Sequence, residues 1–237
     1  MNQQILKELH RHIDVSCVRA ENTMDDVTQM IRYAKEYQFI CAFSMPCFTP
    51  YLANALKEDP DIHTGGVVGF PSGADTTLSK VQQSAQLLEA GCQELDMVIA
   101  VGALKSGDFS YVEQDIAQVV QTARKVPVKV IIEASYLNDA QLETACKIAA
   151  DAGAAYIKSG TGWANIPVNA DTIRKMRAAA PYVKIKAAGG IRTLDQILEM
   201  HEAGCDRFGI GVQTAVRIME ETEKRLVLAN GREHNGI

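Results

Sequence analysis

The feature that most constrains the fold of this 237-residue chain is a repeated alternation of short, strand-like apolar runs with longer, helix-like segments. Eight such strand–helix units in about 240 residues are the number and size expected for a (β/α)8 barrel. An open, doubly wound sheet is the alternative, but no GxGxxG motif follows the first run, which disfavours it. We therefore predict α/β architecture, with residues 1–237 forming one TIM-barrel domain.

The strands and helices are placed from the period of the apolar residues. Strands are expected within residues 12–18, 39–45, 63–70, 93–100, 127–134, 154–160, 183–190 and 206–212. Helices are expected at Asp25–Tyr37, Leu78–Ala90, Val112–Lys125, Asp139–Ala152, Asn169–Ala180 and Leu194–Ala203. A short amphipathic helix carrying Ile5, Leu6 and Leu9 precedes the first strand, and the tail at residues 230–237 is expected to be flexible.

Composition excludes several classes of protein. A net charge of -5 argues against a nucleic-acid-binding surface, and no apolar run is long enough to span a membrane. The N-terminus lacks the apolar core of a secretory signal. Six scattered cysteines predict reduced thiols, mostly in the core, with Cys41 and Cys47 as a redox alternative. We expect a cytoplasmic protein that binds neither nucleic acid nor membranes. A homo-oligomer is possible, but the sequence does not fix the oligomeric state.

Charged residues recur at alternate positions of the predicted strands. Residues two apart share one face of a strand, and the opposite faces here are apolar. The charged faces carry Glu94 and Asp96, Lys129 and Glu133, Lys158, and Lys184 and Lys186. Because the apolar faces would meet the surrounding helices, the charged faces are expected to converge inside the barrel.

Two structural explanations compete with a functional one. Buried charges are costly unless paired, so the residues could form an ion-pair network that fills the barrel, or lie on solvated edge strands. Their number favours an active site, where such groups gather. Asp96, Lys158 and Lys186 lie toward the C-terminal strand ends, where barrel sites form. Glu94, Lys129 and Lys184 are expected to lie deeper and to support them.

Lys158 is the candidate nucleophile. A free lysine, with a pKa near 10.4, is almost fully charged at pH 7, but burial and a second ammonium group both lower the pKa. Lys186 would supply that second ammonium group, and Asp96 could relay protons through water. The pattern predicts Schiff-base chemistry through a carbinolamine, an iminium and an enamine.

Glycine-rich turns follow the sixth, seventh and eighth runs, in KSGTGW, AAGGIRT and FGIGV. Glycines let backbone amides approach an anion, and barrels often bind phosphate after the last two strands. A phosphate-bearing substrate is therefore expected. Trp163, after the first turn, either covers the site or packs against its neighbours. The histidines show no metal-ligand spacing, so no metal site is predicted.

At these residues the chain resembles the deoxyribose-phosphate aldolases, a family of class I, Schiff-base aldolases with a (β/α)8 barrel. The likeness is strongest from Gly65 to Phe208 and rests on VVGFPSGADTT, ELDMVIAVGALKSGDF, VKVIIEASYL, AAYIKSGTGW and IKAAGGIRTLDQILEMHEAGCDRFG. It implies a lyase of carbohydrate metabolism that uses no metal or organic cofactor. It also implies that Lys158 forms the Schiff base, with Lys186 as the second lysine and Asp96 as the proton relay.

The chain departs from this family where substrate is held. The first strand reads IDVSCV in place of IDHTLL, so Asp14 remains but Ser16 replaces a threonine. The family's KTSTG is KSGTG here, and its GTSSG phosphate loop is GIGVQ, residues 209–213 (Gly209, Ile210, Gly211, Val212 and Gln213). The hydroxyl groups that would hold a phosphate are missing. Lys184 adds a deep charge whose role the sequence does not assign.

The site is thus predicted as catalytic Lys158, Asp96 and Lys186. Substrate binding is assigned to Asp14, Ser16, Glu133, Gly160, Thr161, Gly189, Gly190, Gly209 and Gly211. The expected reaction forms or cleaves a carbon–carbon bond in a deoxyribose-5-phosphate-like sugar phosphate or a related small carbonyl or polyol compound. The alternatives are a catalytically silent sugar-phosphate-binding barrel and an isomerase or epimerase that uses Glu133 or Asp96 as base.

Overall fold

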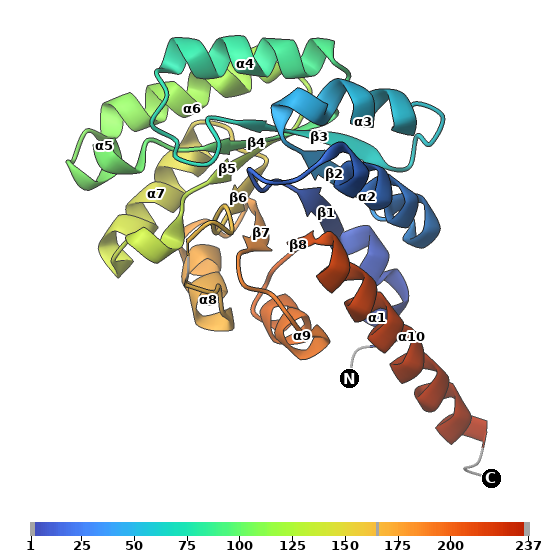
Figure 1. Cartoon of the computed structure of the whole chain (residues 1–237). Coiled ribbons are helices and arrows are strands. Elements are labelled where there is room, and N and C mark those ends of the chain that lie inside the picture. The colour runs from blue at the N-terminus through green and yellow to red at the C-terminus, as the bar shows by residue number, and fades with distance from the viewer. Residues whose placement is uncertain (1–2, 165, 235–237) are drawn as a thin grey trace.

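Each of the eight predicted runs forms a strand, and the strands close into a parallel barrel surrounded by helices (Figure 1). The computed structural model describes residues 3–164 and 166–234. The strands follow one another around the barrel in chain order, and the last pairs with the first through Ile13 and Phe208. The predicted (β/α)8 fold is therefore confirmed, and the open-sheet alternative is wrong because the sheet closes on itself.

The strands are short and lie within the predicted limits. They are β1 (Ile13–Cys17), β2 (Cys41–Ser44), β3 (His63–Val68), β4 (Glu94–Val98), β5 (Val128–Ile131), β6 (Tyr156–Lys158), β7 (Lys184–Ala188) and β8 (Arg207–Gly211). The register sets Lys158 beside Lys186, and Lys186 beside Arg207. It therefore brings basic side chains from three neighbouring strands together.

The six helices that were given bounds are confirmed within three residues at each end. They are α2 (Met24–Tyr37), α4 (Thr77–Glu89), α6 (Phe109–Ala123), α7 (Asp139–Asp151), α8 (Ala170–Ala179) and α9 (Leu194–Glu202). The short helix before the first strand is α1 (Gln3–Glu8), and Leu9 follows it in a 3-10 turn. Helices α3 (Thr49–Leu56), α5 (Val101–Lys105) and α10 (Val212–His234) were not delimited from the sequence. Short 3-10 turns are η1 (Leu9–His12), η2 (Pro46–Phe48) and η3 (Ala134–Tyr136).

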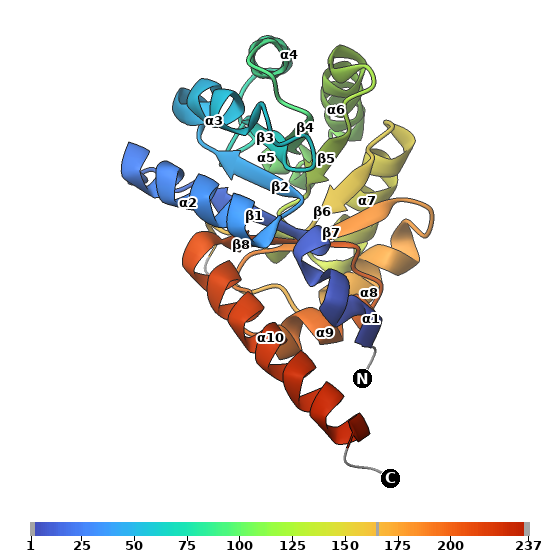
Figure 2. The same ribbon diagram turned by 90° about the vertical axis from the view of Figure 1, so that its right-hand side faces the viewer.

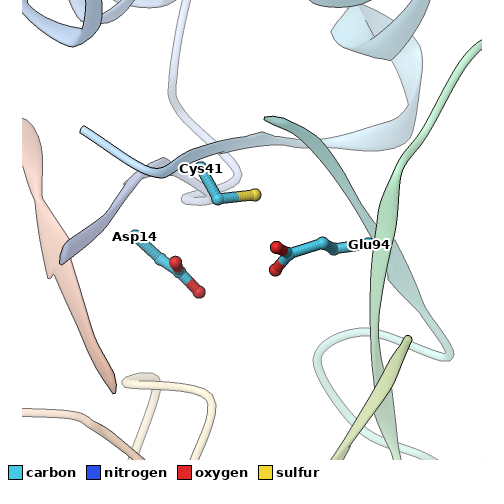
Figure 3. A group of neighbouring side chains, drawn as sticks. All are labelled: Asp14, Cys41 and Glu94. Atoms are coloured by element: carbon cyan, nitrogen blue, oxygen red, sulfur yellow. The ribbon is translucent and has the colours of Figure 1, made fainter. Parts of the chain in front are cut away.

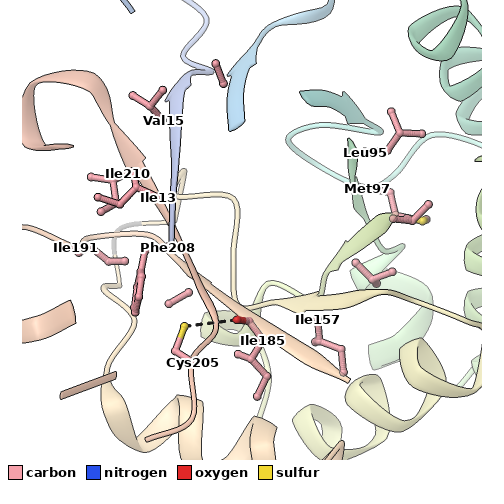
Figure 4. Close-up of a cluster of buried hydrophobic side chains, with 14 of the residues drawn as sticks. Ile13, Val15, Leu95, Met97, Ile157, Ile185, Ile191, Cys205, Phe208 and Ile210 are labelled. Carbon is pink, nitrogen blue, oxygen red and sulfur yellow. Dashed lines mark hydrogen bonds between the residues drawn. The ribbon is translucent and has the colours of Figure 1, made fainter. Parts of the chain in front are cut away.

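The main apolar core lies between the barrel and the helices rather than inside the barrel. Figure 4 shows alternate strand residues such as Val15, Leu95 and Ile157, which are fully buried and point outward into this layer. A smaller apolar cluster of Cys41, Phe43 and Val67 occupies the β2 and β3 side of the interior. The buried charged side chains of the strands share the interior with this cluster.

All six cysteines are free, and five are buried while Cys47 is exposed. This agrees with the prediction of reduced thiols held mostly in the core. Burial raises the pKa of the Cys146 thiol to about 12, which is typical of an unreactive core cysteine.

The C-terminal helix includes the first part of the predicted tail. We expected a flexible tail from residue 230, but α10 continues as helix to His234, and residues 235–237 lie outside the described part of the chain. A single glycine such as Gly231 costs about 1 kcal/mol inside a helix and does not by itself end one. Helix α10 lies beside α1 and extends beyond the barrel (Figure 2). None of the helices in residues 3–164 and 166–234 has the length and apolar character needed to cross a bilayer.

Candidate active site

The C-terminal ends of the strands surround an open cavity of about 660 Å³. Its wall comes mostly from the ends of β1, β6, β7 and β8 and the loops that follow them. Ten of the predicted site residues line it, namely Asp14, Ser16, Asp96, Lys158, Thr161, Lys186, Gly189, Gly190, Gly209 and Gly211. Glu133 and Gly160 do not; they border a smaller cavity of about 90 Å³ behind the β6 loop.

Lys158, Asp96 and Lys186 meet at one point in the large cavity. The amines of Lys158 and Lys186 both donate to Asp96 Oδ2, over 2.8 Å and 2.7 Å. Asp96 is fully buried, Lys186 is 1% exposed and Lys158 is 6% exposed. The barrel thus holds two lysines on one carboxylate oxygen, and Lys158 retains the greater access to the cavity.

This arrangement changes the acid–base properties of both partners. Burial is the largest influence on the pKa of Lys158 and lowers it to about 8; the Asp96 carboxylate opposes that effect and the Lys186 ammonium adds to it. Burial alone would raise the pKa of Asp96, but Lys158, Lys186 and Lys129 outweigh it and hold the pKa below its usual range. Asp96 is therefore ionised at neutral pH, while Lys158 is uncharged part of the time.

A second layer of charges lies beneath these three residues. Lys129, fully buried, contacts Glu94 and lies 3.3 Å from both Asp14 Oδ2 and Asp96 Oδ1. Asp14 Oδ2 also lies 2.6 Å from the Lys186 amine. Glu94 and Lys129 were predicted to lie deeper than the catalytic group, and neither of them lines the large cavity.

Arg207 was missed by the sequence analysis. It is 5% exposed, and its guanidinium donates to Asp14 Oδ1 over 2.8 Å and to both oxygens of Glu94 over 2.9 Å and 2.8 Å. The signal was available, because Arg207 lies two residues before Gly209 and so shares the inward face of the last strand.

Phe43 was also missed, and it borders the same charges. Its ring centroid lies 4.7 Å from the Lys129 amine and 4.3 Å from the Lys186 amine, within reach of a cation–π interaction. A Cβ atom on Gly65 would come within 2.3 Å of this ring, so only glycine at that position leaves room for it.

Asp14, Cys41 and Glu94 lie close enough to suggest a metal site (Figure 3). Their ligand atoms lie within 4.8 Å of one another, but Lys129 and Arg207 already neutralise the two carboxylates. Burial raises the pKa of the Cys41 thiol well above its usual value, so the thiol stays protonated. This group of residues does not suit a divalent ion, and the predicted Schiff-base chemistry needs none.

The glycine-rich turns shape the upper wall of the cavity. Gly190 has a positive φ of 74°, and a Cβ atom there would lie 2.4 Å from Pro167 Cβ. A Cβ atom on Gly209 would lie 3.1 Å from Lys186 Cε, so this glycine gives the lysine its space. Ser16 Oγ donates to the Ile210 carbonyl over 3.4 Å, which ties the first strand to the last.

Glu133 corrects the prediction that it shares the inward face with Lys129. Its φ of 49° is left-handed, which breaks the strand alternation and turns the carboxylate away from the large cavity. The carboxylate instead accepts hydrogen bonds from the Thr161 amide and hydroxyl, over 3.1 Å and 2.6 Å. A Cβ atom on Gly160 would approach Glu133 Oε1 within 2.6 Å. These contacts fix the β6 loop.

Lys184 also departs from its prediction as a deep, supporting charge. It is the first residue of β7 and is exposed, with its amine 5.4 Å from the Tyr156 ring centroid. The first residue of a barrel strand lies at the N-terminal rim, where a long side chain reaches water. Lys184 is therefore absent from the buried cluster.

The loops after β1 and β6 meet at the rim of the cavity. Trp163 Nε1 donates to the Val18 carbonyl over 2.9 Å, and Arg19 Nη2 donates to the Gly162 carbonyl over 2.8 Å. Trp163 lines the cavity and also packs edge-on against Phe70, so both of its predicted roles are compatible with its position. Arg19, which the sequence analysis did not single out, lines the cavity as well.

Comparison with known proteins agrees with this geometry. The family model "DeoC/LacD family aldolase" matches residues 7–214. A deoxyribose-phosphate aldolase of Sinorhizobium medicae is 43% identical over 219 residues, which cover 91% of this chain and 87% of the relative. A deoxyribose-phosphate aldolase of Thermococcus kodakarensis is 40% identical over 222 residues, which cover 90% of this chain and 96% of the relative.

Solved structures show the same likeness. A tetrameric deoxyribose phosphate aldolase from Aeropyrum pernix superposes with a TM-score of 0.85 at 27% identity, covering 93% of this chain and 95% of that one. A protein described as "QR15, an Aldolase" superposes with a TM-score of 0.87 at 28% identity, covering 93% and 98%.

Proposed function

The chain belongs to the DeoC/LacD family of aldolases, and from this premise and the site geometry we propose that Lys158 is the nucleophile of a class I mechanism. The observation that carries this proposal is a buried amine with a pKa of about 8 that lines an open cavity and donates to one carboxylate oxygen. Such an amine is both accessible to a carbonyl compound and uncharged often enough to attack it.

In the direction of bond formation, the lone pair of the Lys158 nitrogen attacks the carbonyl carbon of a donor aldehyde. Proton transfers give a carbinolamine, and loss of water gives an iminium ion. Removal of a proton from the adjacent carbon gives an enamine, which attacks the carbonyl carbon of the acceptor. Water then hydrolyses the new iminium, which releases the product and the free lysine.

Asp96 and Lys186 support these proton transfers. Asp96 Oδ2 lies 2.8 Å from the Lys158 amine, so a water molecule in the cavity could carry a proton between the carboxylate and the reacting carbon. The Lys186 amine, 2.7 Å from the same oxygen, stabilises the ionised form of Asp96.

The proposed substrate is a deoxyribose-5-phosphate-like sugar phosphate or a related small carbonyl or polyol compound. The names of the relatives support the sugar phosphate. The cavity offers Arg19 and Arg192, together with the Gly189–Gly190 turn, to an anionic or hydroxyl-bearing tail. Because Gly211 and Val212 provide no hydroxyl group, we assign phosphate recognition to the two arginines and the Gly189–Gly190 turn rather than to the junction of β8 and α10.

We also propose that the chain acts as one domain and self-associates. The described tetramer of the Aeropyrum relative supports association. Light scattering after gel filtration would test it, and a monomer at micromolar concentration would contradict it.

Borohydride trapping tests the mechanism. Reduction in the presence of deoxyribose 5-phosphate should leave a stable adduct on Lys158 and inactivate the enzyme, and Lys158→Ala should abolish both effects. Lys184→Ala, on the neighbouring strand but exposed, is the matched control and should retain the adduct. A substrate that turns over with no trapped adduct would rule out the imine. Exchange of substrate protons with water, with no fragments released, would favour an isomerase.

A further inference from the structure

Arg207 lies within the barrel but touches neither Lys158 nor the proposed reacting atoms. It starts β8, in register with Lys186, which in turn is in register with Lys158. Neighbouring strands are about 4.8 Å apart, so the backbones at Arg207 and Lys158 are about 10 Å apart. Its guanidinium is held by Asp14 and Glu94. Because a guanidinium does not lose its proton in proteins, this charge is permanent.

The buried charges of the interior do not balance. Among the described residues, four basic side chains contact three carboxylates there: Lys129, Lys158, Lys186 and Arg207 with Asp14, Glu94 and Asp96. Glu133 is also buried, but it is turned into the smaller cavity, where it bonds to Thr161 and forms no ion pair with these four cations. The other groups that face them do not restore the balance. The Cys41 thiol stays protonated, and Tyr156 presents its ring to Lys129 and Arg207. His63 adds no negative charge where it bonds to Glu94.

An excess of one buried cation is unfavourable, and it is relieved most easily by the cation with the fewest carboxylate partners. Lys129 lies against three carboxylates. Lys186 lies against two, as does Arg207. Lys158 has Asp96 alone, and it is the group that opens on the cavity.

We propose that Arg207 is a positioning residue whose permanent charge leaves the barrel interior with one cation in excess, so that Lys158 is the group that releases its proton. This inference rests on the proposed function, because it explains how the nucleophile is made ready. It assigns Arg207 an electrostatic role that acts through Asp14 and Glu94. A purely structural role would instead require only that the two carboxylates be held in place.

The two roles differ in what they predict for the titration of Lys158. If the two charges are about as far apart as the backbones, roughly 10 Å, a unit charge shifts the titration by on the order of one pH unit at an effective dielectric constant near 20. Arg207→Met should therefore raise the midpoint for Lys158 by about one pH unit. Arg207→Lys keeps the charge and should leave the midpoint unchanged. Glu94→Gln increases the excess of buried positive charge and should lower the midpoint of the Lys158 titration.

The double variant Arg207→Met, Glu94→Gln is the decisive comparison. It removes one charge of each sign, which leaves three cations and two carboxylates. The excess is again one, so the midpoint should return to the wild-type value although both partners of the ion pair are gone.

The midpoint is measured by competitive labelling with acetic anhydride between pH 6 and 11, with mass spectrometry of the Lys158 peptide. This reagent needs only a free amine, so the result does not depend on aldolase activity; a failed borohydride trap would contradict the proposed function alone. An unshifted midpoint in folded Arg207→Met overturns the inference about Arg207. If Arg207→Met does not fold, the other two variants decide. The inference about Arg207 is overturned if the Lys158 midpoint in Glu94→Gln is unshifted, or if the midpoint in the double variant differs from that of the wild type.

Discussion

Lys158 is the residue whose protonation state sets the reaction rate in the proposed mechanism. With a pKa of about 8, roughly a tenth of the amine is uncharged at pH 7, against fewer than about one in a thousand for an ordinary lysine. Because the uncharged form attacks, kcat/KM should rise as the pH rises. We expect an increase of about fiftyfold from pH 6 to pH 8 and a plateau above about pH 9. Initial rates of retro-aldol cleavage would measure it, and a flat profile would contradict it.

Glu133 offers a test of how the β6 loop is held. Its carboxylate accepts both hydrogen bonds from Thr161, and Glu133→Ala would leave the buried amide of Thr161 without a partner. An unsatisfied buried donor costs about 1–3 kcal/mol, so the loop should shift and the catalytic efficiency should fall by about tenfold or more.

Glu133→Gln is the matched control, because its amide oxygen can still accept both bonds. It should retain most of the activity in the same cleavage assay. A large loss in the glutamine variant would instead mean that the negative charge is needed, as expected if Glu133 acted as a base.

Residue by residue, the sequence predicts the site best at the centres of strands. Alternation correctly places Asp96, Lys129 and Lys186 on the inward face, because the backbone there is regular. It fails for Glu133, just past a strand end, where a left-handed backbone overrides the two-residue period. Lys184 does face the Tyr156 ring inside the barrel, as alternation predicts, but it is exposed because it begins its strand.

At the scale of the elements, the strands and most helices could be predicted because their apolar periods are distinct. Helix α10 could not, because it begins at Val212 directly after β8 ends at Gly211, with no turn residues between them. Helix α3 is short and has a proline at its start, so its segment carries less than three turns of periodic signal.

The Phe43 ring of β2 lies over Gly65 of β3, in the space that a side chain would otherwise occupy. The Cβ atom of an alanine there would lie 2.3 Å from Phe43 Cζ, and the displaced ring would press on Lys129 and Lys186. Overpacking of a core costs about 1–3 kcal/mol. Gly65→Ala should therefore lower both the free energy of unfolding in urea and kcat.

Gly102→Ala is the matched control for this substitution. Gly102 lies in α5, and a Cβ atom there meets nothing within 4 Å. Because alanine favours helix, this variant should be neutral or more stable by up to about 1 kcal/mol. Equal effects of the two substitutions would contradict the packing explanation for Gly65.

For the whole molecule, the consequence of a charged interior is that stability depends on pH in the acidic range. Cations, and for Glu94 also the hydrogen bond with His63, hold the pKa values of Asp14, Glu94 and Asp96 below their usual range, although burial alone would raise them. In the unfolded chain these groups titrate near pH 4. The unfolded state therefore binds more protons than the folded state below about pH 5, and stability is present above that range and lost as the pH falls.

We expect the free energy of unfolding in urea to fall steadily from about pH 5 to pH 2, with a slope that approaches about 4 kcal/mol per pH unit where all three carboxylates contribute. The exposed Asp171 provides a matched control, and Asp171→Asn should leave the slope unchanged. The double variant Arg207→Met, Glu94→Gln removes one of the three carboxylates with its cation and should reduce the slope by about a third. A wild-type stability that is flat across this range would mean that the buried ion pairs do not stabilise the barrel, and that the apolar layer between strands and helices maintains the fold alone.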